Sequence, residues 1–246
     1  MTTATPPGPA PTSHDRAARR AVVTGASSGI GVAIAHDLVA AGWEVLGLSR
    51  SRGALSDAAT WVPCDLADVT SAAEAVSTVR ETLAGGVGAI VHAAGLQYSA
   101  GVGHLRPDHG ERMWAVHVRG AELVVGGLVD ALVDGGRVVL VGSRTMTGVP
   151  GKSQYAATKA ALAAMARAWA AELAPRRITV NVVGPGPTRT AMLDDPNRAS
   201  VPPVQPPLGR LVEPSEVAAL TRFLLERTGA MVTGQTIVIC GGASLG

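Results

Sequence analysis

The chain has 246 residues, a formal net charge of +2 and 47% hydrophobic residues, enough apolar material for one large α/β domain. The small net charge and the lack of a basic run argue against nucleic acid as a main partner. Cys64 and Cys240 are far apart and form no CxxC pair, so we expect reduced, buried thiols, a cytoplasmic protein and no metal site. No apolar run reaches membrane-spanning length, so we expect no membrane partner.

Residues 1–19 differ in composition from the rest of the chain. They are rich in Pro, Thr, Ala and Ser and lack the apolar segment of a secretory signal. We expect a disordered N-terminal extension here, followed by a single domain over residues 20–246.

From Ala21 onward, short β-rich runs alternate with longer helical ones. The sequence predicts strands at 20–25, 43–49, 60–66, 87–95, 136–143, 177–187 and 234–242. It predicts helices at 29–42, 70–86, about 107–133, from near 153 to about 173, and 214–227. Continuous apolar strands that alternate with helices indicate an α/β fold, a parallel sheet of about seven strands covered on both faces. Ligands of such sheets bind beyond the carboxyl ends of the strands.

A glycine-rich turn, VVTGASSGIG, joins the first strand to the first helix. Its TGxxxGxG spacing lets the backbone turn sharply and approach a pyrophosphate, while the helix N-terminus offers unpaired N–H groups. We therefore expect the turn to bind a dinucleotide through Gly25, Ser27, Ser28, Gly29, Ile30 and Gly31.

The end of the second strand indicates which dinucleotide binds. A carboxylate there would bind the ribose hydroxyls of NAD. Ser49 occupies that position, and Arg50 and Arg52 follow it. Arginine suits a 2′-phosphate through paired hydrogen bonds and stacking on adenine, so NADP(H) is favoured over NAD(H). The alternative is that both arginines are solvated surface side chains.

TGASSGIG and YAATK, with an upstream serine, NVVGPGPTRT and a terminal TGQTIVICGG, resemble motifs of the short-chain dehydrogenase/reductase family. The resemblance is to its short, single-domain, ketoacyl-reductase-like branch and runs from about Arg20 to Gly242. It implies a Rossmann-type doubly wound sheet, hydride transfer to or from a nicotinamide, and a homotetramer or homodimer.

The resemblance also implies roles for individual residues. Tyr155 and Lys159 match the catalytic pair of the family, and Ser143 matches its catalytic serine. Asp65 matches the residue that contacts the adenine amine. The other cofactor contacts implied, besides Tyr155 and Lys159 themselves, are Leu66, Ala93, Ala94, Gly95, Pro185, Gly186, Thr188 and Thr190.

Two histidines depart from the family pattern. The sequence HAAG, which begins at His92, stands where the family usually has NNAG, and we expect His92 to pack at the end of its strand. His117 stands where the fourth catalytic residue, an asparagine that holds a water beside the lysine, is expected. One hypothesis is that the His117 imidazole takes over this role and adds a proton relay that titrates near neutral pH. The other is a packed histidine that bonds the backbone.

A carbonyl reductase must deliver a proton to oxygen while a hydride reaches carbon. Tyrosine has a pKa of about 10, and general acid/base work favours a value nearer the operating pH. We expect the Lys159 ammonium, helped by the oxidised nicotinamide, to lower the pKa of Tyr155 by about 3 units. We expect the Ser143 hydroxyl to donate a hydrogen bond to the substrate oxygen.

The substrate should lie against Tyr98, Met146 and Pro187, near Leu96, Gln97, Arg144 and the proline-rich segment 191–210. Met192 and Leu193 in that segment favour a neutral, partly apolar ketone. The sequence thus predicts an NADP(H)-dependent oxidoreductase that converts a small-molecule carbonyl compound and its secondary alcohol. The alternative is a non-catalytic NADP(H)-binding sensor or scaffold of the same fold.

Overall fold

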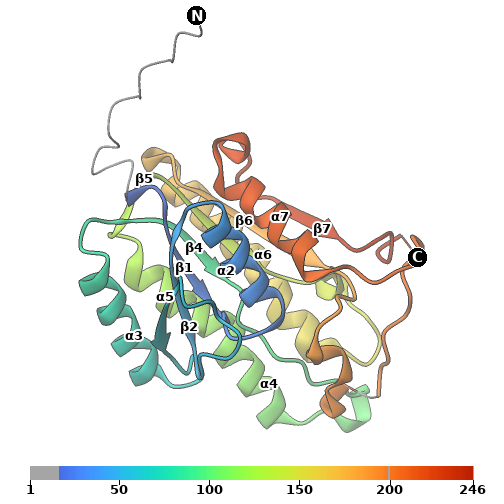
Figure 1. Ribbon diagram of the computed structural model, residues 1–246. Helices are drawn as coiled ribbons and strands as arrows, with labels where there is room; N and C mark the ends of the chain where they lie inside the picture. The colour runs from blue at the N-terminus through green and yellow to red at the C-terminus, as the bar shows by residue number, and fades with distance from the viewer. Residues whose placement is uncertain (1–16, 199, 246) are drawn as a thin grey trace, which may run out of the picture.

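A parallel sheet forms the centre of the domain (Figure 1). In the computed structural model, which describes residues 17–198 and 200–245, the sheet has seven strands in the order β3-β2-β1-β4-β5-β6-β7. All neighbouring strands pair in parallel. The strands are β1 (Arg20–Thr24), β2 (Glu44–Ser49), β3 (Thr60–Pro63), β4 (Val87–His92), β5 (Leu132–Val141), β6 (Thr179–Pro185) and β7 (Thr236–Ile239).

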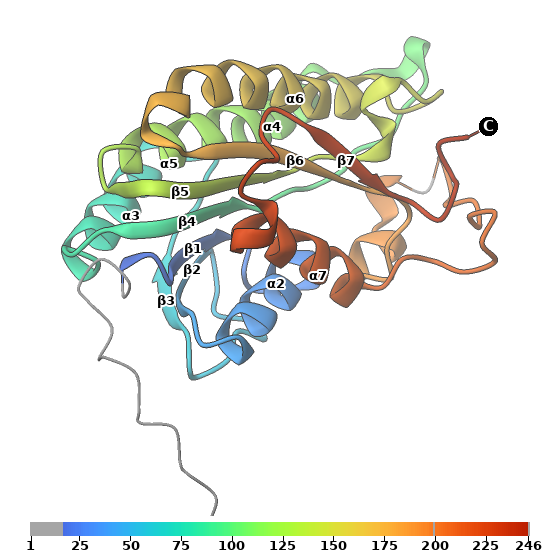
Figure 2. The same cartoon turned by 90° about the horizontal axis from the view of Figure 1, so that it is seen from above.

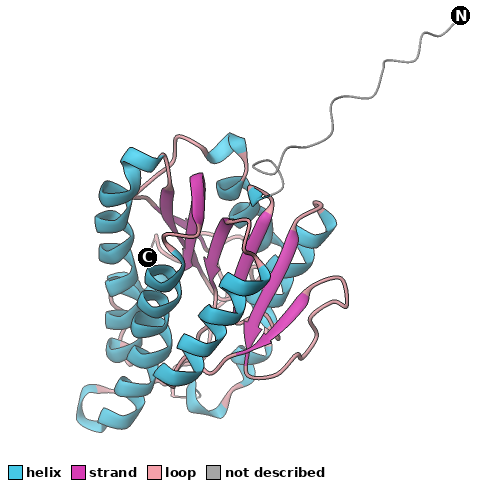
Figure 3. Ribbon diagram, turned by 90° about the vertical axis from the view of Figure 1, so that its left-hand side faces the viewer, coloured by secondary structure: helices cyan, strands magenta, loops and turns pink. Residues whose placement is uncertain are grey.

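Helices cover both faces of this sheet (Figures 2 and 3). The helices α3 (Val69–Thr82), α4 (Pro107–Trp114), α5 (Gly120–Leu128) and α6 (Ser153–Leu173) lie on one face, and α2 (Gly29–Ala40) and α7 (Pro214–Leu225) lie on the other. Strand residues alternate between the two cores: Val22 packs with α3, α5 and α6, whereas Val23 packs with α2 and α7. This is the doubly wound Rossmann-type fold that the sequence predicted.

Helix ends follow from local side-chain chemistry. The Asp68 carboxylate accepts hydrogen bonds from the N–H groups of Thr70 and Ser71 and so begins α3. Gly42, just beyond α2, takes φ +81°, a left-handed conformation that ends the helix.

The prediction of a long helix from about 107 to 133 is confirmed as far as Leu128 and was wrong only at its end. The segment is α-helical over Pro107–Trp114, opens into a π-helical turn at Ala115–Arg119, and ends at Leu128 with α5. The following strand begins at Leu132 rather than at Gly136. Gly135 takes φ +79°, and the pairing with β4 shifts register there, so the strand runs through two glycines that sequence patterns treat as a boundary.

The N-terminal boundary of the packed chain lies before Arg20. Ala17 is buried, and the Arg19 guanidinium donates to the carbonyl of Ala41. The extension expected from the sequence falls mainly on residues 1–16, which lie outside the described residues. Within residues 17–198 and 200–245, none of the helices combines the length and the apolar character needed to cross a membrane.

Candidate active site

The candidate site lies where the strand order reverses, at the carboxyl ends of β1 and β4. The Thr24 hydroxyl oxygen accepts hydrogen bonds from the N–H groups of Ala93 and Ala94, each at 3.1 Å. A Cβ on Gly25 would lie only 2.7 Å from the Cα of Ala94, so the two loops approach as closely as glycine permits. A cavity of about 510 Å³ opens beyond these strand ends, which is where doubly wound sheets bind their ligands.

The first turn of α2 is built for an anion. Ser28 precedes the helix in an extended conformation and its side chain does not cap the helix; the first turn carries no acidic residue. A Cβ on Gly31 would lie 2.2 Å from the carbonyl oxygen of Gly25, so the turn can close only with glycine there. The first-turn N–H groups thus lack a side-chain acceptor and suit a dinucleotide pyrophosphate.

The far end of the cavity is lined by Ser49, Arg50, Asp65 and Leu66. The two arginines after β2 differ there. Arg52 is 2.5 Å from the Asp57 carboxylate and does not line the cavity, whereas Arg50 lines it and has no ion-pair partner among the described residues. Of the two arginines, Arg50 is therefore the one that faces the cavity.

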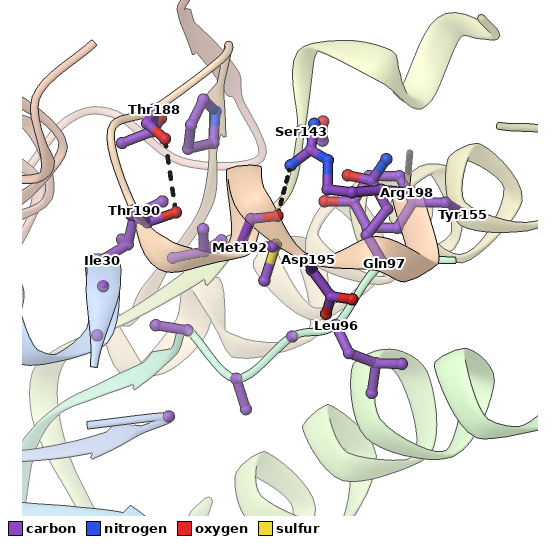
Figure 4. Close-up of a pocket in the computed structure, with 18 of the residues that line it drawn as sticks. Ile30, Leu96, Gln97, Ser143, Tyr155, Thr188, Thr190, Met192, Asp195 and Arg198 are labelled. Carbon is purple, nitrogen blue, oxygen red and sulfur yellow. Dashed lines mark hydrogen bonds between the residues drawn. The ribbon is translucent and has the colours of Figure 1, made fainter. Parts of the chain in front are cut away.

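Ser143 and Tyr155 face the other end of the same cavity (Figure 4). Ser143 follows β5, and its hydroxyl lies 2.9 Å from that of Thr145 while accepting from the Thr145 N–H at 3.2 Å. Tyr155 comes from the first turns of α6. Burial raises the pKa of Tyr155, and a hydrogen bond with the Ser143 side chain acts in the opposite direction. The phenol is therefore neutral in the protein without ligands.

Lys159, one helical turn beyond Tyr155, lies behind the cavity rather than on its wall. Its Nζ donates to the carbonyl of Val141 at 2.8 Å and lies 5.9 Å from the centroid of the Tyr155 ring. Burial lowers the pKa of Lys159 to about 7. Burial disfavours the phenolate and the ammonium alike, and the lowering of the pKa of Tyr155 by Lys159 and the oxidised nicotinamide stays a prediction.

His117 sits in the π-helical turn, is fully buried and does not line the cavity. The Leu96 N–H donates to its Nε2 at 3.1 Å, so the proton is on Nδ1, which lies 2.8 Å from the Thr158 hydroxyl. That hydroxyl in turn donates to the Tyr155 carbonyl. Burial holds the pKa of His117 well below 6.5. Both ring nitrogens are occupied and the ring is neutral, which fits the packed alternative rather than a relay that titrates near neutral pH.

His92, at the end of β4, is also fully buried and neutral, because burial lowers its pKa to about 3. Since the Thr24 hydroxyl already accepts two N–H groups, its proton goes to His92 Nδ1, 3.0 Å away. The His92 proton is then on Nε2, which has no hydrogen-bond partner among the described residues. The backbone carbonyls of Val116 and His117 oppose this lowering of the pKa of His92, so the π-helical turn lies beside the His92 ring.

The other predicted positions can now be located. Tyr98 and Pro187 line the cavity; Met146 does not, because its Cε packs beside Gly142 and Gly184 under the sheet, and its prediction as a substrate contact was wrong. The remaining predicted cofactor positions that line the cavity are Gly25, Ser27, Ser28, Gly29, Ile30, Gly31, Ala93, Ala94, Gly95, Pro185, Gly186, Thr188 and Thr190.

Sequence reasoning missed some lining residues, notably Lys152, Arg112, Val116 and Val149, and named Arg198 only within its segment. A signal for Lys152 was present in the sequence, because it is the only lysine besides Lys159.

Comparison with known proteins agrees with this geometry. A family model described as enoyl-(acyl carrier protein) reductase matches residues 25–244. Carbonyl reductase family member 4 of Danio rerio is 35% identical over 240 residues, 92% of this chain and 98% of the relative. A short-chain dehydrogenase of Burkholderia cenocepacia, solved with NADP, is 32% identical with a TM-score of 0.81 and covers 92% of this chain and 98% of its own.

A second solved structure, 3-ketoacyl-(acyl-carrier-protein) reductase of Brucella melitensis with NADH, is 27% identical with a TM-score of 0.81, over 92% of this chain and 98% of its own. Fold, cavity and matches together define an oxidoreductase of the Rossmann type. The chain belongs to the short-chain dehydrogenase/reductase family and is similar to its ketoacyl-reductase members.

Proposed function

We propose that the protein is an NADP(H)-dependent reductase of a carbonyl compound, reversible as an alcohol dehydrogenase. The observation that carries the proposal is that one cavity joins the glycine turn at Gly25–Gly31 to the Ser143 and Tyr155 hydroxyls. Nothing in dinucleotide binding alone requires those two hydroxyls and a buried amine at Lys159. The names of the similar proteins, a carbonyl reductase and a ketoacyl reductase, support the same reaction type.

The chain's own residues perform the proton chemistry. Tyr155, kept neutral by burial, gives its proton to the carbonyl oxygen, and Ser143 donates a hydrogen bond to that oxygen as negative charge develops. The glycine turn at Gly25–Gly31 would hold a nicotinamide dinucleotide, which would supply a hydride for the carbonyl carbon. The proton transfer leaves a phenolate at Tyr155. The protonated amine of Lys159, 5.9 Å from the centroid of the tyrosine ring, stabilises that phenolate.

The preference for NADP(H) rests on Arg50 and Ser49. Ser49 lines the cavity where a carboxylate would bind the ribose of NAD, and beside it lies the Arg50 guanidinium, which has no ion-pair partner among the described residues. The Burkholderia structure contains NADP and the Brucella structure NADH, so the relatives use both cofactors. The preference is therefore argued from this chain's own residues.

The test is oxidation of NADPH and of NADH against a panel of ketones, aldehydes and β-ketoacyl thioesters. We expect sustained NADPH consumption with at least one carbonyl and a slower reaction with NADH. Tight NADPH binding without turnover on any carbonyl would favour the alternative, a non-catalytic sensor, for which the replacement at His117 is the motivating observation.

We further propose a homotetramer or homodimer. Phe223 on α7 and Val238 on β7 are large apolar side chains left 44% and 43% exposed. Light scattering after gel filtration would measure the mass; a monomer at micromolar concentration would contradict this proposal.

A further inference from the structure

Two buried cations stand at the substrate end of the cavity, beside the catalytic hydroxyls. Lys152 and Arg198 are each only 7% exposed, and both line the cavity together with Ser143 and Tyr155. Figure 4 shows Arg198 next to Ser143 and Tyr155. Charged side chains are rarely buried unless a counter-charge balances them.

Neither cation has a counter-charge of its own in the described part of the chain. No carboxylate lies within 4.0 Å of Lys152 or Arg198. Arg198 Nη1 donates to the Met192 carbonyl at 3.2 Å, while its Nε is buried without a hydrogen-bond partner. The Nε atom is covered by protein, so Arg198 meets the cavity with other atoms of its side chain, and a guanidinium placed there can pair with a carboxylate.

The surrounding charges do not remove the imbalance. Arg144 also lines the cavity and donates to the Ala243 carbonyl. Burial, and after it the charges of Arg198 and Arg144, lower the pKa of Lys152 to about 8. Asp194 and Asp195, of which Asp195 also lines the cavity, attract Arg198 but form no ion pair with it among the described residues. Asp195 Oδ1 already accepts two hydrogen bonds from Asn197, each at 2.9 Å.

We propose that Arg198 and Lys152 form an oxyanion subsite that binds a carboxylate of the substrate, so that the substrate is an oxo acid. This inference rests on the proposed reductase function and narrows its substrate class. The carboxylate supplies the missing counter-charge and fixes the carbonyl against Ser143 and Tyr155. It replaces the neutral ketone that Met192 and Leu193 suggested: these two side chains line the same cavity, but they leave the charge of the two buried cations unbalanced.

The experiment compares matched substrates with NADPH as cofactor: pyruvate, acetoacetate and laevulinate, each beside its methyl ester. We expect kcat/KM for at least one oxo acid to exceed that of its ester by about 10-fold or more. Arg198→Met should lower kcat/KM for that acid by roughly 10- to 100-fold and change the ester by less than about 3-fold. Arg167→Met, an exposed arginine on α6 outside the cavity, should change neither.

Calorimetric titration with malonate and with inorganic phosphate gives a readout that needs no turnover. We expect malonate to bind the wild type and the Arg167→Met protein and to bind Arg198→Met at least about 10-fold more weakly. Lys152→Met should weaken binding in the same direction and serves if Arg198→Met fails to fold.

The outcomes separate the two proposals. Reduction of esters in preference to acids, without malonate binding, would overturn the subsite and leave the reductase function standing. Phosphate bound more tightly than malonate would overturn the carboxylate in favour of a phosphate ester. Malonate binding that depends on Arg198, without reduction of any carbonyl, would support the subsite and contradict the reductase function.

Discussion

The two buried histidines make the protein sensitive to mild acid. His92 and His117 are both fully buried, and burial lowers the pKa of His92 to about 3 and that of His117 well below 6.5. In the unfolded chain both titrate at about 6.5. Because the folded pKa is the lower one, their contribution to stability is complete above pH 6.5 and is lost as the pH falls toward the folded value.

The size of the effect follows from proton linkage. Between pH 6.5 and 5.0 the unfolded chain takes up a proton at residue 92 that the folded chain does not, which costs about 1.6 kcal/mol, and the lowered pKa of His117 adds to this loss in the same direction. Below pH 6.5 the buried Lys159, with a pKa of about 7, is protonated in both states and adds little.

Urea unfolding at fixed protein and salt concentration over this pH range measures the slope. In His92→Asn, the decrease in the free energy of unfolding between pH 6.5 and 5.0 should be about half that of the wild type, whatever the stability of the variant at pH 7. His104→Asn, an exposed control, should remove none. A wild-type slope retained in His92→Asn would refute the reasoning, because it would mean that the buried ring takes up its proton without unfolding.

Three further changes test the site. Arg50→Ala should weaken NADPH binding by roughly 10-fold or more and leave NADH binding unchanged, whereas Arg52→Ala, whose side chain pairs with Asp57, should affect neither in a fluorescence titration. Gly31→Ala should abolish binding of both cofactors, because its Cβ would lie 2.2 Å from the carbonyl oxygen of Gly25. Gly126→Ala is the matched control in α5, where a Cβ meets open space, and it should raise the free energy of unfolding by about 0.5–1 kcal/mol. His117→Asn should keep the shape of the pH–rate profile between pH 5.5 and 8, since the ring is neutral throughout; loss of a limb near pH 6.5 would restore the relay hypothesis.

The sequence predicted the fold well, because strand alternation, glycine spacing and helix signals all agree along this chain. It failed where a tertiary contact decides the backbone. The strand at Leu132–Val141 runs through Gly135 and Gly136, and its pairing with β4 passes over them, from Leu132 directly to Arg137. The π-helical turn around His117 likewise depends on bonds from Leu96 and to Thr158, which lie far away in the chain.

Within the site, the sequence located the residues whose chemistry is tied to a motif. Tyr155 and the glycines are examples, and they line the expected cavity. The sequence did not indicate which side chains point into the core and which point toward the cavity. Met146 follows Ser143 by three residues, yet its side chain turns into the core, while Arg198 and Lys152 turn toward the cavity. Which way a loop side chain points depends on packing that no local pattern records, and the raised pKa of Tyr155 depends on burial in the same way.

The central claim is that the Tyr155 hydroxyl gives a proton to the substrate while other groups hold the cofactor. The most direct test is Tyr155→Phe, with turnover of a reducible carbonyl and NADPH binding measured on the same preparation. The account predicts a loss of kcat of roughly 10²- to 10⁴-fold with a dissociation constant for NADPH within about 3-fold of the wild type. A phenylalanine variant that retains most of its turnover would contradict the account, because another group would then have to supply the proton.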